Sequence, residues 1–212
     1  MDAKLEVCDN CASKVPFYTG RFLMEDSGGR LQDSCDRVVC ALKYTDMVKA
    51  AMMRFKFSQR PEFGRVFGAF LAEKIAREER EGVFSIVTSV PLSKERERER
   101  GYNQAEIIAR YIALYLNVTY MGALLRRNSG TLRQSGLNGA ERSRNAKGSF
   151  VLNDSDEGLG FLKGRTILLV DDVSTTLSTI NAGASALKAG GAAIVVGAVA
   201  TSGMAGGGER RL

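Results

Sequence analysis

The sequence predicts an α/β fold: a parallel sheet flanked by helices, with a small cysteine-rich module in front of it. A strand, a small-residue helix and a second strand follow one another over residues 166–200. A further apolar strand at 83–90 lies between two helical segments, and all four cysteines fall within the first 40 residues. We therefore expect a cysteine module at residues 1–45 and an α/β domain at residues 46–212.

The composition is that of a folded protein, with 44% hydrophobic and 25% charged residues among 212. The sequence contains neither a signal peptide nor an apolar run of about 18 residues that could span a membrane. We therefore expect a soluble, cytoplasmic protein whose thiols are free or metal-bound rather than paired in disulfides.

Two helices and a strand are predicted in the first half of the domain. Residues 46–60 read as a bridge of alternating basic and apolar character, and 83–90 as a buried strand that ends at Pro91. The helix at 102–116 places Ile108, Ile112 and Tyr115 on one face. The helix at 62–79 has apolar residues at helical spacing: Phe63, Phe67, Phe70, Leu71 and Ile75.

A long polar segment separates two short predicted strands near 118–124 and 149–152. Residues 121–150 contain six basic residues against one acidic residue, Glu141. A loop of this length in a compact domain usually has a function, such as an active-site lid. Its charge favours phosphate, pyrophosphate or nucleic acid, although a solvated surface loop explains the same composition.

The last segment is a βαβ unit. Residues 166–170 form an apolar strand, 178–189 a helix that ends at Gly190-Gly191, and 193–200 a second strand. A connection of this length makes the two strands parallel. The tail after Ser202 is rich in glycine.

The loop of the βαβ unit has the chemistry of a sugar-phosphate site. Asp171 and Asp172 follow the strand, at the edge where open α/β sheets bind ligands, and their carboxylates suit vicinal hydroxyls. A helix N-terminus comes next and favours phosphate. The ligand satisfying both is a ribose 5-phosphate, although ordinary loop capping also explains the aspartates. Hydroxyl residues that suit the phosphate are Ser174, Thr175, Thr176, Ser178 and Thr179.

Two other classes share an apolar strand that ends in two aspartates. Receiver domains need about 100 further residues after it, which this sequence does not have. Nucleoside triphosphatases need a Gly-x-x-x-x-Gly-Lys-Ser/Thr loop, and none occurs.

Residues 168–179 resemble the phosphoribosyl pyrophosphate loop of type I phosphoribosyltransferases. More of the chain resembles one branch of that family, the ComF-like competence proteins, which also have paired cysteines at the front. The matching residues, in order, are Val90-Pro91-Leu92, Arg100-Gly101-Tyr102-Asn103-Gln104-Ala105, Thr131 with Gln134, Arg142 with Asn145, Gly148-Ser149-Phe150 and the Asp171-Asp172 loop.

The resemblance implies a role for each part of the site. Asp171 and Asp172 would hold the ribose hydroxyls, and Mg²⁺ would accompany the pyrophosphate. The 5-phosphate would lie against Ser174, Thr175, Thr176, Leu177, Ser178 and Thr179. The pyrophosphate loop would comprise Pro91, Leu92, Arg96 and Arg100. A mobile hood would contain Arg126, Arg127, Arg133, Gln134, Arg142 and Asn145.

Two functions follow from the resemblance. The first is a Mg²⁺-dependent phosphoribosyltransferase that transfers or senses the phosphoribosyl group. The second is a DNA-uptake component that binds single-stranded DNA and partner proteins without turnover. Bases could stack on Phe55, Phe57 and Tyr102, which could equally be core residues.

Leu177 departs from the family pattern, which has glycine at this position of the loop. Glycine accepts a positive φ and a close backbone approach, and leucine resists both. We therefore expect either a variant loop conformation or weakened phosphate binding.

The cysteines form two pairs, Cys8 with Cys11 and Cys35 with Cys40. Four thiolates would make a closed tetrahedral site for a structural Zn²⁺ in a zinc-ribbon-like module. Free thiols or a redox pair are the alternatives.

Residues 94–100 alternate basic and acidic side chains. The pattern is typical of a solvated helical turn with i, i+3 and i, i+4 ion pairs. By the resemblance, Arg96 and Arg100 could instead contact ligand or nucleic acid.

Overall fold

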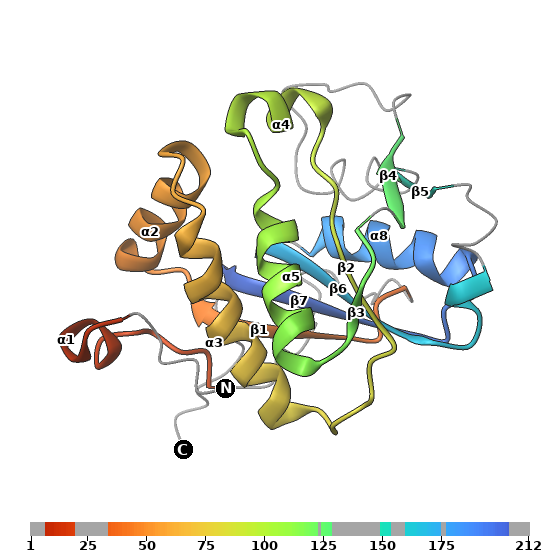
Figure 1. Ribbon diagram of the computed structural model, residues 1–212, viewed down its shortest axis with the longest axis horizontal. Coiled ribbons are helices and arrows are strands. Elements are labelled where there is room, and N and C mark those ends of the chain that lie inside the picture. Colours follow the sequence, from red (N-terminus) through yellow and green to blue (C-terminus); the bar gives the residue numbers. More distant parts are fainter. Residues whose placement is uncertain are drawn as a thin grey trace, which may run out of the picture.

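The computed structural model describes residues 7–19, 34–122, 124–128, 149–153, 160–174 and 177–203. Figure 1 shows how its helices and strands are arranged. The helices are α1 (Asp9–Ala12), α2 (Asp46–Phe57), α3 (Glu62–Glu78), α4 (Lys94–Arg100), α5 (Gln104–Leu116) and α8 (Ser178–Ala189). The strands are β1 (Arg37–Lys43), β2 (Ile86–Ser89), β3 (Thr119–Tyr120), β4 (Leu125–Arg127), β5 (Phe150–Leu152), β6 (Thr166–Ser174) and β7 (Ile194–Ser202).

A five-stranded parallel sheet forms the centre of the structure, with the order β1-β7-β6-β2-β3. Strand β6 lies in the middle and pairs with β7 on one side and β2 on the other. Strands β4 and β5 form a separate antiparallel pair. The structure therefore confirms the predicted α/β class and the parallel pairing of the last two strands.

Helices cover both faces of the sheet (Figure 1). Helices α2, α3 and α5 pack on one face, and α8 with the β4–β5 pair packs on the other. Successive side chains of a strand point to opposite faces. In β6, Leu168 and Val170 accordingly lie in the core beneath α2, α3 and α5, whereas Ile167 and Leu169 lie in the core beneath α8.

The structure corrects three expectations. Residues 46–57 of the predicted bridge at 46–60 form a helix, because Val48, Met52 and Phe55 are buried at helical spacing. Strand β6 continues past residue 170, because its pairing with β7 extends to Ser174. This pairing is made by backbone groups, so the polar side chains after residue 170 do not end it. Tyr115 does not face the core with Ile108 and Ile112; it is exposed.

The segment at 34–43 joins the predicted cysteine module to the sheet. Strand β1 lies inside the range expected for that module and pairs with β7. Residues before it also reach β1: Phe17 forms a bridge with Leu42, and the Tyr18 amide donates to the Ala41 carbonyl at 2.8 Å. None of the helices in the described part of the chain is long and apolar enough to cross a membrane.

Helices α3 and α5 approach closely at two glycines of α3. A Cβ atom at Gly64 would lie 2.5 Å from Ile107 Cγ2, and one at Gly68 would lie 2.9 Å from Tyr111 Cβ. This contact fixes α5, whose first residues reach the carboxyl edge of the sheet.

We expect Gly64→Ala to lower the free energy of unfolding by about 1–3 kcal/mol, measured by urea denaturation, because the added methyl group overpacks the contact. In an unobstructed helix the same change would stabilise by about 1 kcal/mol. Combining it with Ile107→Ala should cost less than the sum of the two single changes. Additive effects, or a stabilised Gly64→Ala variant, would contradict the close packing.

Candidate functional site

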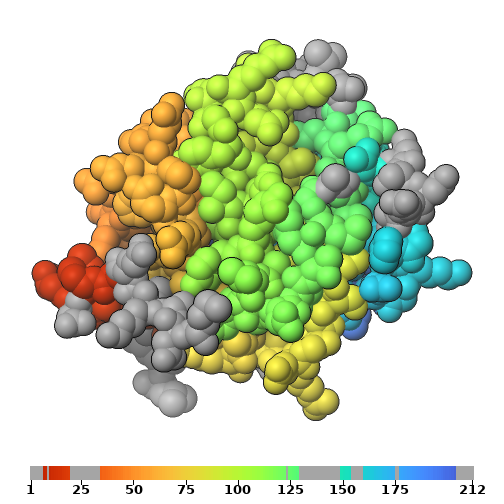
Figure 2. All heavy atoms as spheres, viewed as in Figure 1, coloured from red at the N-terminus to blue at the C-terminus, as the bar shows by residue number. Residues whose placement is uncertain are grey.

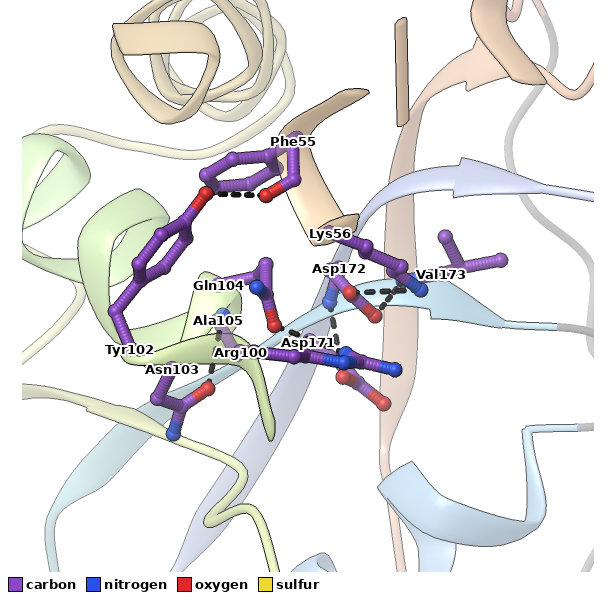
Figure 3. Close-up of polar contacts among 10 residues, drawn as sticks. All are labelled: Phe55, Lys56, Arg100, Tyr102, Asn103, Gln104, Ala105, Asp171, Asp172 and Val173. Carbon is purple, nitrogen blue, oxygen red and sulfur yellow. Dashed lines mark hydrogen bonds and ion pairs between the residues drawn. The ribbon is translucent and has the colours of Figure 1, made fainter. Parts of the chain in front are cut away.

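Asp171 and Asp172 lie at the carboxyl end of β6, the central strand. The Asp172 amide donates to Asp171 Oδ1 at 2.9 Å, and the Val173 amide donates to Asp172 Oδ1 at 2.6 Å. These bonds fix both carboxylates against the backbone. The two side chains leave the strand in different directions (Figure 3).

Lys56, near the end of α2, neutralises Asp172. Its Nζ lies 2.8 Å from Asp172 Oδ2, and the two side chains are only 16% and 13% exposed, so the ion pair is largely shielded from water (Figure 3). Lys56 is not among the site residues that the sequence predicts, because residues 46–60 are predicted as a bridge and not as a helix. The available signal was a lysine beside an apolar stripe at helical spacing.

Asp171 is half-buried and carries the unusual electrostatics of the site. Burial, and then the neighbouring Asp172 carboxylate, raise the pKa of Asp171 to about 7. The Asp172 amide, Lys56 and Arg127 act in the opposite direction on the same pKa. Two neighbouring carboxylates, one of them buried away from water, therefore resist being ionised together.

Arg127, on β4, connects the predicted hood to the predicted pyrophosphate loop. Its Nε donates to the Pro91 carbonyl at 3.0 Å, and its guanidinium lies 4.9 Å from the centre of the Phe150 ring. Arg126, also on β4, is exposed. The remaining predicted hood residues lie outside the described residues: Arg133, Gln134, Arg142 and Asn145.

Arg100 and Gln104 add buried donors to the site (Figure 3). An Arg100 terminal nitrogen donates to Gln104 Oε1 at 2.9 Å, and the guanidinium lies 5.3 Å from the centre of the exposed Phe57 ring. Within the described part of the chain, Arg100 Nε and Gln104 Nε2 are buried without a hydrogen-bond partner. Buried donors of this kind are uncommon in proteins, and they suit an acceptor-rich ligand.

The other residues of the predicted pyrophosphate loop are placed differently. Pro91 and Leu92 follow β2 and are half-buried. Arg96 is exposed on α4, where its amide donates to Ser93 Oγ at 3.3 Å and caps the helix. The structure confirms that residues 94–100 form a helical turn, and none of its residues is buried. Figure 2 shows the yellow-green atoms of α4 at the top of the molecule.

The predicted phosphate loop is partly described. Ser174 is buried at the end of β6, and its Oγ accepts a hydrogen bond from the Leu177 amide at 3.0 Å. Ser178 and Thr179 lie in the first turn of α8 and are half-buried. Thr175 and Thr176 lie outside the described residues.

Leu177 occupies the left-handed region, with φ 56° and ψ 1°, directly before α8. Its side chain is buried in the core beneath α8. The position therefore has the positive φ that glycine accepts without strain, and here the anchoring of an apolar side chain offsets the strain.

The two cysteine pairs lie in different surroundings. Cys8 and Cys11 are exposed on and beside α1, and hydrogen bonds from the Cys11 backbone and thiol lower the pKa of Cys8. Cys35 and Cys40 are buried, which raises their pKa values to about 11 and about 12. Both buried thiols donate to backbone carbonyls, Cys35 to Arg37 and Cys40 to Leu42. In the described residues no three potential ligands come together at a metal site, and the zinc site stays a prediction.

Comparisons with known proteins identify relatives of the chain. It is 28% identical over 180 residues to competence protein F of Haemophilus influenzae, covering 82% of this chain and 75% of that one. It is 29% identical over 162 residues to DNA utilization protein YhgH of Salmonella typhimurium, covering 75% and 69%. No protein-family model matches the chain.

The solved structures with a similar arrangement include the glutamine phosphoribosylpyrophosphate amidotransferase of B. subtilis, complexed with ADP and GMP. The likeness covers 70% of this chain and 30% of the amidotransferase, with 18% sequence identity and a TM-score of 0.44.

The positive φ at Leu177 predicts that a glycine variant is more stable there than an alanine variant, the reverse of the usual order in a helix. Leu177→Ala removes buried surface and keeps the strained φ, whereas Leu177→Gly also relieves the strain. We expect the alanine variant to be less stable than the glycine variant by about 1 kcal/mol in urea denaturation. At Leu187, buried in the last turn of α8, the alanine variant should be more stable than the glycine variant. The same order at both positions would argue against the left-handed conformation.

Proposed function

Since the chain is a ComF-like homologue of competence protein F, we propose that its α/β domain binds phosphoribosyl pyrophosphate with Mg²⁺ and transfers or senses the phosphoribosyl group. The observation that carries the proposal is the pairing of opposite charges at the carboxyl edge of the sheet. Asp171 and Asp172 lie in the carboxyl-terminal half of the central strand. Three other elements bring cations around them: Lys56, Arg100 and Arg127.

Each half of the site suits a different half of the ligand. Carboxylates accept hydrogen bonds from vicinal hydroxyls, which the ribose supplies. The unpartnered donors on Arg100 and Gln104 suit diphosphate oxygens. The N-terminus of α8, after Ser174, suits the 5-phosphate.

Magnesium would come with the ligand. The described residues contain no group of three potential metal ligands, and Asp172 is already paired with Lys56. Mg²⁺ keeps several waters and binds readily to phosphate oxygens with few protein ligands. The metal would neutralise the diphosphate as leaving group.

Transfer at this site would depend on positioning and charge stabilisation. No covalent protein nucleophile is required when the anomeric carbon, the leaving diphosphate and an acceptor are held in line. A closed hood would exclude water from the oxocarbenium-like transition state.

We expect the double variant Asp171→Asn, Asp172→Asn to lose at least about tenfold in affinity for phosphoribosyl pyrophosphate with Mg²⁺, measured by calorimetry, because an amide accepts a hydrogen bond from a ribose hydroxyl less well than a carboxylate does. Asp46→Asn, on the exposed first turn of α2, is the matched control and should bind as the wild type does. A folded wild type that does not bind, or a double variant that binds equally well, would contradict the proposal.

A second candidate function is DNA uptake, favoured by the names of the relatives, one a competence protein and the other a DNA utilization protein. The chain would then bind single-stranded DNA, and partner proteins, without turnover. Arg96 and Arg98 are exposed on α4, and the exposed ring of Phe57 lies under Arg100. Basic side chains beside an aromatic ring suit a single strand.

For this function we expect salt-dependent binding of a single-stranded oligonucleotide, measured by fluorescence anisotropy. Replacing Arg96 and Arg98 with alanine should reduce the slope of the logarithm of the binding constant against the logarithm of the salt concentration by about one to two. Each lost phosphate contact lowers the magnitude of this slope by about one. Arg80→Ala with Lys163→Ala removes the same charge from exposed positions elsewhere and serves as control. Equal losses in both double variants would indicate an effect of net charge alone.

A further inference from the structure

The two aspartates at the end of β6 are not equivalent. Both oxygens of Asp172 are engaged, Oδ1 by the Val173 amide and Oδ2 by Lys56. Asp171 Oδ1 accepts from the Asp172 amide, whereas Asp171 Oδ2 accepts no hydrogen bond from the described residues. Of the two aspartates, Asp171 is therefore the one with an oxygen that no group of the described residues occupies.

The geometry of the strand explains this difference. Side-chain alternation puts Asp172 on the face of Leu168 and Val170, which α2 covers, and Asp171 on the opposite face. Lys56 is the cation that α2 brings to the first of these faces. Its side chain is largely buried with that of Asp172, so each supplies the charge that the other needs.

We propose that Lys56 is a positioning residue that gives the two carboxylates different roles. It holds Asp172 in the layer of α2 and leaves Asp171 as the carboxylate that receives a ligand hydroxyl. This inference rests on the proposed sugar-phosphate function and deepens it. Lys56 acts through the aspartates and does not itself contact the ligand.

The charges around Asp171 explain why Lys56 is needed. Asp172, Lys56 and Arg127 are the charged groups that act on Asp171, from β6, α2 and β4. Without Lys56, the two adjacent carboxylates would lose the cation that is paired with Asp172, and the pair would bind its proton more tightly. A protonated carboxyl group is a poorer acceptor for a sugar hydroxyl, so binding would weaken until the pH is high enough to remove the proton.

The experiment compares Lys56→Met, which keeps the apolar stem and removes the charge, with Lys56→Arg, which keeps the charge. Lys49→Met, on the exposed face of α2, is the matched control. Calorimetry with phosphoribosyl pyrophosphate and Mg²⁺ is carried out at about pH 6.5 and about pH 8.5, where the proportion of ionised carboxyl groups differs. Urea denaturation shows that each variant is folded.

We expect Lys56→Met to bind about tenfold more weakly at the lower pH and to regain most of its affinity at the higher pH, since one pKa unit changes the ionised fraction up to tenfold. Lys56→Arg and Lys49→Met should bind nearly as the wild type does. An equal loss at both pH values would show that Lys56 contacts the ligand directly, and would overturn the proposal.

A second readout needs no ligand. Carboxyl ¹³C NMR titration should show a higher pKa for Asp171 in Lys56→Met than in the wild type or in Lys49→Met. An unchanged titration would also overturn the proposal. If the wild type binds no phosphoribosyl pyrophosphate but its aspartate titration shifts as expected, the proposed function fails and the role of Lys56 in orienting Asp172 stands.

Discussion

Two adjacent carboxylates at the end of a buried central strand are the constraint on which this site depends. Like charges at neighbouring positions disfavour ionisation, and burial adds to the effect. The fold meets the constraint with cations from different layers, Lys56 from the helices on one face of the sheet and Arg127 from the β4–β5 pair beside the other. The positions of α2 and β4 are therefore part of the chemistry of Asp171 and Asp172.

The packing of the domain explains how these cations are held. Helix α2 is anchored by Met52 and Phe55, which are fully buried in the core beneath it, so the next residue, Lys56, is fixed above the sheet edge. Tyr102 donates a hydrogen bond to the Phe55 carbonyl and connects the end of α2 to the start of α5. This contact links Lys56 to the region of Arg100 (Figure 3).

Much of the fold could be predicted from the sequence, because it is encoded locally. The helix at Glu62–Glu78 and the strand–helix–strand unit from β6 to β7 have clear periodicity and clear stops. The acidic pair could be found because it follows an apolar strand. The roles of Lys56 and of the buried Gln104 amide could not be predicted, because they depend on contacts between elements that are separate in the sequence. Leu177 was recognised as unusual, but its buried side chain depends on the core beneath α8.

Leu177 shows how stability and binding are connected at the other end of the site. A leucine held at positive φ is strained, yet its side chain contributes to the core beneath α8, and its amide is held by Ser174 Oγ. The start of α8 is therefore fixed by packing rather than by the freedom that glycine would give. A rigid helix N-terminus suits a phosphate whose position does not change, whereas a loop that must adjust during turnover benefits from glycine. Under the proposed function, a fixed helix start would suit a site that senses a bound phosphate better than one that transfers rapidly.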